Sequence, residues 1–218
     1  YPPTTLVEIE NTHNRMGGII FPQADAIAIC AAARAHRIAS YLDGARLWNV
    51  SVETGLSVAA LAAPFDLAMV SMSKGLGAPG GSLLAGPKDL IRAAVRYRRM
   101  LGGAMRQVGL FAAAADHALD HHVERLAEDH ANAKRLAAAL ARSPRIRIDL
   151  ASVQTNVLVF DIVPDAAVPD SFAVVSRARD RGLLINALSA TRIRALTHLD
   201  APAAACDAAA RILADILG

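Results

Sequence analysis

Short runs of β-branched and aliphatic residues alternate with alanine-rich stretches of helical spacing, and this alternation constrains the fold of the chain most strongly. The predicted strands cover residues 5–10, 38–42, 67–71 and 82–85, and helices are predicted between them at residues 23–36 and 47–54. Strands that alternate with helices imply right-handed crossover connections and a mainly parallel sheet. The first half of the chain is therefore expected to be of the α/β class.

From residue 87 onward the pattern becomes mostly helical, and a second α/β segment follows. Helices are predicted at residues 88–100, 107–119, 123–141, 170–181 and 202–217, and strands at residues 145–149, 157–161, 183–186 and 193–196. We expect three parts: residues 1–122 as a portion of a large domain, residues 123–143 as a connecting helix, and residues 144–218 as a small C-terminal α/β domain with an antiparallel sheet.

Composition excludes several classes of protein. Hydrophobic residues make up 54% of the 218 residues and charged residues 20%, so neither a disordered chain nor a collagen-like fibre is expected. The net charge of +3 and the mostly dispersed basic residues argue against nucleic acid as a partner. Apolar runs are far shorter than the about 20 residues of a membrane-spanning helix, so no membrane is expected as a partner. Two distant cysteines, Cys30 and Cys206, predict core thiols and a reducing, cytoplasmic compartment.

Reactive residue types follow each of the first three predicted strands. Residues 11–14 (NTHN) follow the first strand, Asp43 and Arg46 the second, and Lys74 the third. In an open α/β sheet, reactive groups gather at the carboxyl ends of the strands. A partly desolvated lysine has a lowered pKa and forms Schiff bases with carbonyl compounds, and an aspartate on the neighbouring strand end can bind a pyridinium nitrogen. The alternative interpretation of Lys74 is a surface charge beside a glycine turn.

Five dispersed motifs occur in the order and approximate spacing of one family. They are residues 10–14 (ENTHN), 43–46 (DGAR), 73–79 (SKGLGAP), 105–107 (MRQ) and 197–200 (THLD). In these motifs the chain resembles the low-specificity L-threonine aldolases, which are aspartate-aminotransferase-like (type I) enzymes. The resemblance implies a PLP-dependent transferase (type I) fold and pyridoxal 5'-phosphate as cofactor. It also implies cleavage of L-threonine or L-allo-threonine to glycine and an aldehyde, by a homo-oligomer (dimer or tetramer) with shared active sites.

The resemblance assigns roles toward the cofactor to three residues. Lys74 matches the lysine that holds the cofactor covalently, and Asp43 matches the carboxylate that faces the pyridine nitrogen. Arg106 matches an arginine that reaches the cofactor phosphate of a neighbouring subunit. Members of the family are longer, and the resemblance places their phosphate-binding loop and a ring-stacking histidine before Tyr1. The chain therefore looks like the later two-thirds of such an enzyme, and we expect it to bind the cofactor weakly alone.

The resemblance also assigns roles toward the substrate. Arg46 and Arg194 match the two arginines that bind the substrate carboxylate. Arg192 lies two residues from Arg194, and an alignment shifted by two residues would assign the role to Arg192 instead. His13 matches the histidine near the substrate hydroxyl and is our choice as the general base. Two rival functions stay open: another pyridoxal-phosphate β-eliminating lyase that acts on cysteine-like amino acids, and a non-catalytic fragment.

Three histidines form a possible metal site on a predicted helix. His117 and His121 are four residues apart, and His122 follows. Acidic residues surround them in the sequence, and two histidines make an incomplete zinc set. A solvated helix face is the better interpretation, and no metal is predicted.

Overall fold

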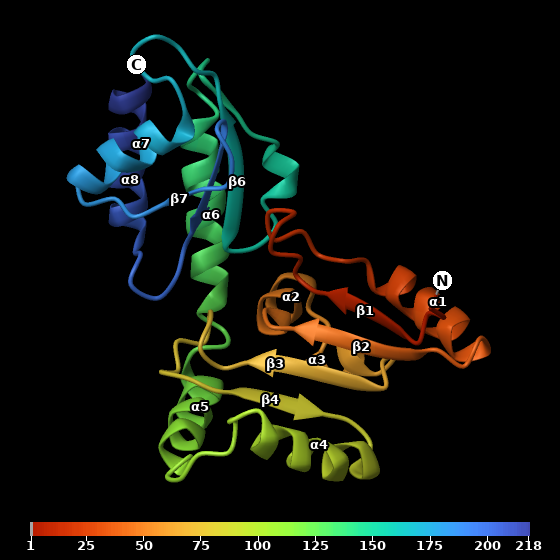
Figure 1. The fold of residues 1–218 in the computed structure, drawn as a ribbon. Coiled ribbons are helices and arrows are strands. Elements are labelled where there is room, and N and C mark those ends of the chain that lie inside the picture. The colour runs from red at the N-terminus through yellow and green to blue at the C-terminus, as the bar shows by residue number, and fades with distance from the viewer. Residues whose placement is uncertain (1) are drawn as a thin grey trace. The chain divides into compact units, whose positions relative to one another are not determined.

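The computed structural model describes residues 2–218, which divide into two compact units. Unit 1 comprises the chain up to Thr12 together with Ile20–Arg125, and unit 2 comprises His13–Ile19 and Leu126–Gly218 (Figure 1). Among residues 2–218, no helix combines the length and the hydrophobicity needed to cross a membrane.

Unit 1 is built on a four-stranded sheet of order β1-β2-β3-β4 (Figure 1). Its strands are β1 (Leu6–Glu10), β2 (Ala39–Gly44), β3 (Leu67–Ser71) and β4 (Ser82–Ala85). The first three strands are parallel and β4 is antiparallel to β3, which confirms the mainly parallel sheet expected from the sequence. The helices of this unit are α1 (Gln23–Ala35), α2 (Leu47–Thr54), α3 (Val58–Ala62), α4 (Lys88–Met100) and α5 (Gly109–His121).

The core of unit 1 lies between the sheet and the helices that follow β2. Leu42 of β2 packs with Leu47 and Val50 of α2 and with Leu61 of α3, and all four side chains are buried. Each fully buried aliphatic side chain contributes about 1.5–3 kcal/mol to stability. Helix α3 was not predicted from the sequence, although Ser57 caps it by accepting a hydrogen bond from the Ala60 N–H at 3.1 Å.

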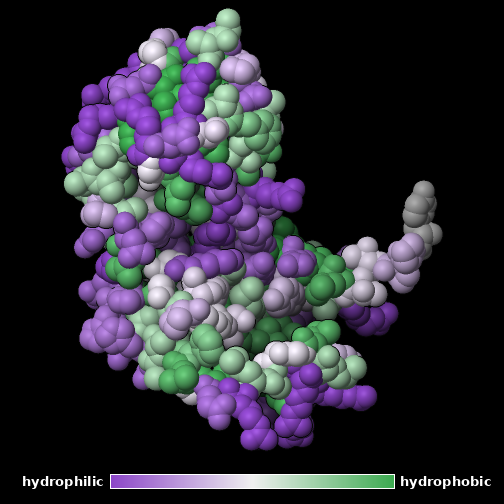
Figure 2. Space-filling view, turned by 60° about the vertical axis from the view of Figure 1, so that its left-hand side comes forward, coloured by the Kyte–Doolittle hydropathy of each residue, from purple (hydrophilic) through white to green (hydrophobic). Residues whose placement is uncertain are grey.

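Hydrophobic side chains also reach the surface of unit 1, among hydrophilic ones (Figure 2). No residue of α4 is buried, and all four residues of β4 are exposed. The large exposed hydrophobic side chains on β4, on α4, in the segment after α4 and at the start of α5 are Leu83, Leu84, Leu90, Val95, Tyr97, Met100, Leu101, Met105, Val108 and Leu110. Exposed apolar surfaces of this extent are typical of interaction sites.

Unit 2 contains an antiparallel sheet of order β5-β6-β8-β7. Its elements are α6 (Leu126–Leu140), β5 (Ile146–Arg147), the 3-10 helix η1 (Leu150–Ser152), β6 (Val157–Ile162), α7 (Ser171–Asp180), β7 (Asn186–Ala187), β8 (Arg192–Leu196) and α8 (Ala203–Leu217). Buried residues of α6, α7 and α8 form one core with alternate residues of β6 and β8. The antiparallel arrangement expected for the C-terminal segment is thus confirmed.

One predicted strand of unit 2 is wrong in position. The strand expected at residues 183–186 lies at Asn186–Ala187. The reason is the end of α7, where Gly182 has a φ of +81° and the Leu183 N–H donates to the Ala178 carbonyl at 2.9 Å. Residues 182–183 therefore close the helix instead of beginning a strand.

Candidate functional site

Three predicted site residues of unit 1, Asp43, Arg46 and Lys74, lie at or shortly after the carboxyl ends of neighbouring parallel strands. Asp43 near the end of β2 is paired in register with Glu10 of β1 and with Met69 of β3. The Asn11 N–H, directly after β1, donates to the Asp43 carbonyl at 2.9 Å. Lys74 lies in the loop directly after β3. The topology therefore brings the residues after β1, β2 and β3 to one edge of the sheet.

Asp43 is held by its own turn. Its carboxylate Oδ1 accepts a hydrogen bond from the Ala45 N–H at 2.9 Å. The next residue must be glycine, because a Cβ on Gly44 would lie 2.5 Å from the Met69 carbonyl oxygen of β3. Burial raises the pKa of the Tyr41 hydroxyl, and the negative charges of Asp43 and Glu8 raise it further. Asp43 thus adds negative charge to the end of β2.

Arg46 is buried and stands at the point where α2 begins. Its carbonyl accepts from the Asn49 N–H at 3.0 Å, so the first turn of α2 fixes its backbone. Thr12 follows the end of β1 by two residues, and its hydroxyl oxygen is buried without a hydrogen-bond partner within residues 2–218. A buried hydroxyl rarely stays unpaired, so this oxygen can accept or donate a bond to a bound group.

Lys74 is exposed in a glycine-rich loop between β3 and β4. Within residues 2–218 its side chain is therefore open to solvent, and the partial desolvation expected from the sequence is not seen there. The backbone of the loop is closed by main-chain hydrogen bonds from Gly77 N–H to the Lys74 carbonyl at 2.9 Å and from Ala78 N–H to the Met72 carbonyl at 3.0 Å.

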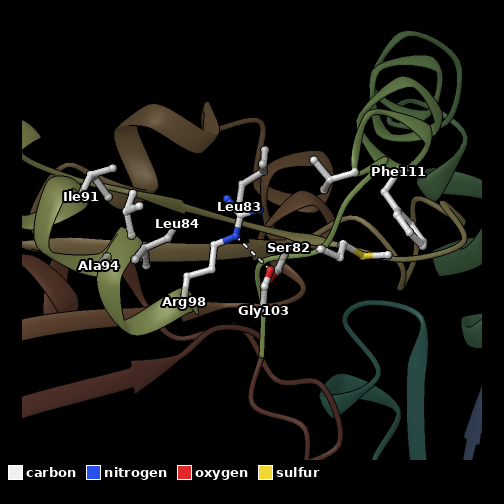
Figure 3. Close-up of a pocket in the computed structure, with 12 residues that line it drawn as sticks. Ser82, Leu83, Leu84, Ile91, Ala94, Arg98, Gly103 and Phe111 are labelled. Atoms are coloured by element: carbon white, nitrogen blue, oxygen red, sulfur yellow. Dashed lines mark hydrogen bonds between the residues drawn. The ribbon is translucent and has the colours of Figure 1, made fainter. Parts of the chain in front are cut away.

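Arg106 and the residues that line a cavity of unit 1 belong to parts of the chain other than β1, β2 and β3. Arg106 is exposed in the turn before α5. The cavity of about 620 Å³ is lined mainly by apolar side chains of β4, α4, α5 and the segment between the two helices. Figure 3 shows its lining, where Arg98 Nε donates to the Gly103 carbonyl at 2.9 Å. Its lining contains none of the predicted site residues, so this cavity is not the site that the sequence indicates.

In unit 2, the loop His13–Ile19 covers one face of the antiparallel sheet. The loop is closed by two main-chain bonds, from His13 N–H to the Ile19 carbonyl at 3.1 Å and from Gly18 N–H to the His13 carbonyl at 2.9 Å. A Cβ on Gly18 would lie 2.7 Å from the Cβ of Val157, so the loop packs directly on β6. His13 itself is exposed, and its Nδ1 accepts a hydrogen bond from the Met16 N–H at 3.3 Å. A neutral ring in this arrangement carries its proton on Nε2.

Arg194 lies on the same face of that sheet as the His13 loop. It pairs in register with Val159 of β6, and a Cβ on Gly17 would lie 3.4 Å from the Val159 side chain. The Nε atom of Arg194 is buried without a hydrogen-bond partner within the described part of the chain. In contrast, Arg192 donates two hydrogen bonds to the Asp161 carboxylate. The two arginines that the sequence left interchangeable therefore differ: Arg192 is bound to a carboxylate, whereas the Nε of Arg194 has no hydrogen-bond partner in the described part of the chain.

Sequence reasoning missed one contact beside Lys74. His122 Nδ1 lies 2.6 Å from the carbonyl oxygen of Leu76, two residues after Lys74. No local sequence signal predicts it, because 46 residues separate the two partners. Within residues 2–218, no group of three or more His, Cys, Asp or Glu side chains is arranged to hold a metal ion.

Comparison with known proteins identifies relatives of this chain. The profile of the family described as beta-eliminating lyase matches residues 1–163. The chain is 36% identical over 198 residues to low-specificity L-threonine aldolase 1 of Arabidopsis thaliana, covering 91% of this chain and 55% of the relative. It is 38% identical over 197 residues to a low specificity L-threonine aldolase of Escherichia coli O157:H7, covering 90% of this chain and 56% of the relative. The chain thus spans about half the length of these relatives.

Solved structures resemble the chain in fold. A threonine aldolase of Leishmania major matches with a TM-score of 0.75 at 21% identity, and the match covers 98% of this chain and 61% of the aldolase. A PLP-dependent aminotransferase of Streptococcus suis matches with a TM-score of 0.74 at 14% identity, and the match covers 98% of this chain and 57% of the aminotransferase. These likenesses confirm the PLP-dependent transferase-like fold class expected from the sequence.

Proposed function

Because the chain belongs to the beta-eliminating lyase family, we propose that it is part of a pyridoxal-phosphate-dependent aldehyde lyase that cleaves L-threonine and L-allo-threonine to glycine and an aldehyde. The names of relatives at 36% and 38% identity support this substrate class. The observation that carries the proposal is the position of Asp43 near the carboxyl end of β2 and of Lys74 after the adjacent parallel strand β3, at one edge of the sheet. A carboxylate and an amine in this arrangement are the two groups that a pyridoxal cofactor requires.

The residues present at this edge fit the cofactor. Asp43 offers a carboxylate for the ring N–H, Lys74 offers the amine for the aldehyde, and the unpaired Thr12 hydroxyl is a further buried polar group for a bound molecule. When bound, pyridoxal 5'-phosphate supplies an electron sink that stabilises the carbanion left on the substrate. Arg106 is proposed to reach the phosphate of a neighbouring subunit.

Two arginines are proposed to bind the substrate carboxylate. Arg46 is buried beside the start of α2, so its backbone is fixed before any ligand binds. The buried, unpaired Nε of Arg194 supports Arg194 over Arg192, whose guanidinium already binds Asp161. An arginine binds a carboxylate with directed hydrogen bonds and thus limits rotation of the substrate.

His13 is proposed to act on the β-hydroxyl of the substrate, directly or through a water molecule. The Met16 N–H occupies its Nδ1, so the neutral ring presents an Nε2–H donor. For His13 to act as the general base, the loop must release Nδ1 so that the proton can move to that atom. If the loop keeps Nδ1 bound, the role of His13 is instead to donate a hydrogen bond from Nε2–H to the substrate hydroxyl oxygen and so to position it.

The proposal extends to assembly and location. The exposed apolar side chains on β4 and α4 support a homo-oligomer with shared active sites, a dimer or tetramer. Cys30 and Cys206 are buried and not joined in a disulfide, which supports a reducing, cytoplasmic location.

The test of this function is covalent trapping followed by a substrate comparison. The full-length protein is incubated with pyridoxal 5'-phosphate, reduced with borohydride and mapped by mass spectrometry. We expect the label on Lys74 and its loss in Lys74→Ala; a parent protein without label on Lys74 overturns the proposal. Glycine and acetaldehyde formed from threonine, measured against ammonia released from cysteine, then separate an aldolase from another β-eliminating lyase.

A further inference from the structure

His122 joins the end of α5 to the loop that carries Lys74. It directly follows α5 (Gly109–His121) and is half-buried. Its Nδ1 lies 2.6 Å from the carbonyl oxygen of Leu76. A carbonyl oxygen only accepts hydrogen bonds, so Nδ1 carries the hydrogen and donates it. Both the neutral ring with its proton on Nδ1 and the protonated ring make this bond.

The loop needs an anchor of this kind. Glycines at positions 75, 77, 80 and 81 give it a high conformational entropy before folding. Its two ends are held by main-chain bonds, from Met72 N–H to the Gly81 carbonyl at 3.1 Å and from Ala78 N–H to the Met72 carbonyl at 3.0 Å. Between these ends, the Leu76 side chain is buried, at 1% exposure, and its carbonyl binds His122.

The orientation of the His122 ring is itself supported. The ring of His117, five residues earlier on α5, packs edge-on against it with centroids 5.5 Å apart and planes at 88°. The ring of His121 packs on His117 in turn, at 4.4 Å. The three histidines therefore form a packed cluster, and His122 is the member that bonds to the loop of Lys74.

We propose that His122 is a positioning residue for Lys74: its Nδ1–H holds the Leu76 peptide and thereby fixes the turn of residues 74–77 from which the Lys74 side chain projects. The inference rests on the proposed function of Lys74. It assigns to His122 no contact with substrate or cofactor. Loss of the bond leaves the buried Leu76 carbonyl unpaired and lets the peptide rotate, so Lys74 samples more orientations.

The test compares three variants in the full-length protein. His122→Leu removes the donor. His122→Asn keeps one, because the amide nitrogen of asparagine is attached to Cγ as Nδ1 is in histidine. His121→Leu is the matched control, since it removes an exposed imidazole one residue away.

Two measurements are made on each variant. The first is hydrogen exchange at the Gly77 and Ala78 amides, whose hydrogen bonds close the turn. The second is the rate at which pyridoxal 5'-phosphate, trapped by borohydride, labels Lys74 relative to the exposed Lys88 and Lys134. In His122→Leu we expect about fivefold faster exchange and about fivefold slower labelling of Lys74, the effect of one net hydrogen bond. His122→Asn and His121→Leu should stay within about twofold of the parent, at the low end of the effect of one hydrogen bond.

The outcomes separate the two proposals. If the parent protein labels Lys74 no faster than Lys88 and Lys134, the proposed function fails, whatever His122 does. If the parent labels Lys74 preferentially and His122→Leu behaves as the parent does, the positioning role is overturned. The role is also overturned if His122→Asn is as slow as His122→Leu, because the effect then does not depend on the hydrogen bond.

Discussion

Arg192 binds Asp161 through two parallel hydrogen bonds, from Nε to Oδ1 at 2.9 Å and from Nη2 to Oδ2 at 2.8 Å. The pair joins β8 to β6, where the two residues are directly opposite in register. Arg194 follows two residues later on the same face of the sheet, but opposite the uncharged Val159. The neighbour across the sheet therefore decides which arginine has a guanidinium available for a ligand.

The first prediction concerns these two arginines. Arg194→Ala should raise the KM for L-threonine roughly 10- to 100-fold, because a hydrogen bond to a charged group contributes about 1.5–3 kcal/mol. Arg192→Ala is the control and should change KM by less than about twofold, since its exposed ion pair contributes little. Steady-state kinetics of both variants decide the assignment, and an exchange of the two results would move the role to Arg192.

A second prediction concerns the charge on Asp43. Asp43→Asn keeps the size of the side chain but removes the negative charge that stabilises a protonated ring nitrogen. Each pKa unit lost by that nitrogen corresponds to about 1.36 kcal/mol, so we expect kcat for threonine cleavage to fall at least about tenfold. Lys74 should still be labelled on borohydride trapping. Unchanged kcat in a variant with a full complement of cofactor would remove Asp43 from this role.

The imidazole of His13 gives a third prediction. His13→Phe should slow threonine cleavage by about 10²- to 10⁴-fold, the usual contribution of a positioned acid–base group. Cofactor content, measured by absorbance, should stay at the parent level because Lys74 and Asp43, which are proposed to hold the cofactor, are unchanged in this variant. Turnover equal to that of the parent would assign the proton transfer to another group.

Packing of the His13 loop on β6 gives a stability prediction. Gly18 has a φ of +77°, and a Cβ there would lie 2.7 Å from the Val157 Cβ. Gly18→Ala therefore lowers the free energy of unfolding in two ways. Overpacking costs about 1–3 kcal/mol, and an alanine in the left-handed conformation costs about 1–2 kcal/mol. Gly182→Ala in the same unit is the control, because its φ is +81° but nothing lies within 4 Å. Thermal unfolding should show Gly18→Ala as the less stable variant; equal losses would contradict the packing.

Reactivity of the thiols gives the fifth prediction. Burial raises the pKa of both Cys30 and Cys206, so each has less thiolate than an exposed cysteine at the same pH. Iodoacetamide at pH 8 should label neither thiol in the folded protein within the time that labels both in guanidinium chloride. Rapid labelling of the native protein would show that these sites open readily.

Much of the fold follows from local pattern. Helix α2 and the strands β3 and β4 have the bounds predicted for them, because apolar spacing and glycine or proline neighbours specify such elements within a few residues. The missed helix α3 has only five residues, too few for a periodic pattern, and depends on its Ser57 cap. The strand predicted at residues 183–186 lies at Asn186–Ala187, because the apolar residue after Gly182 takes part in the end of α7 and not in a strand.

By itself, the sequence predicted the order of the strands and of the helices other than α3 and η1, and it placed Asp43, Arg46 and Lys74 at or after strand ends, since these properties depend on residues close together in the chain. Only the tertiary structure decided that Arg192 is bound to Asp161, that the His13 loop packs on β6, and that His122 holds Leu76. These contacts join residues that are 31 to 142 positions apart in sequence, and His122 and Leu76 are separated by 46. Their partners are selected by register and packing across elements, which no local pattern encodes.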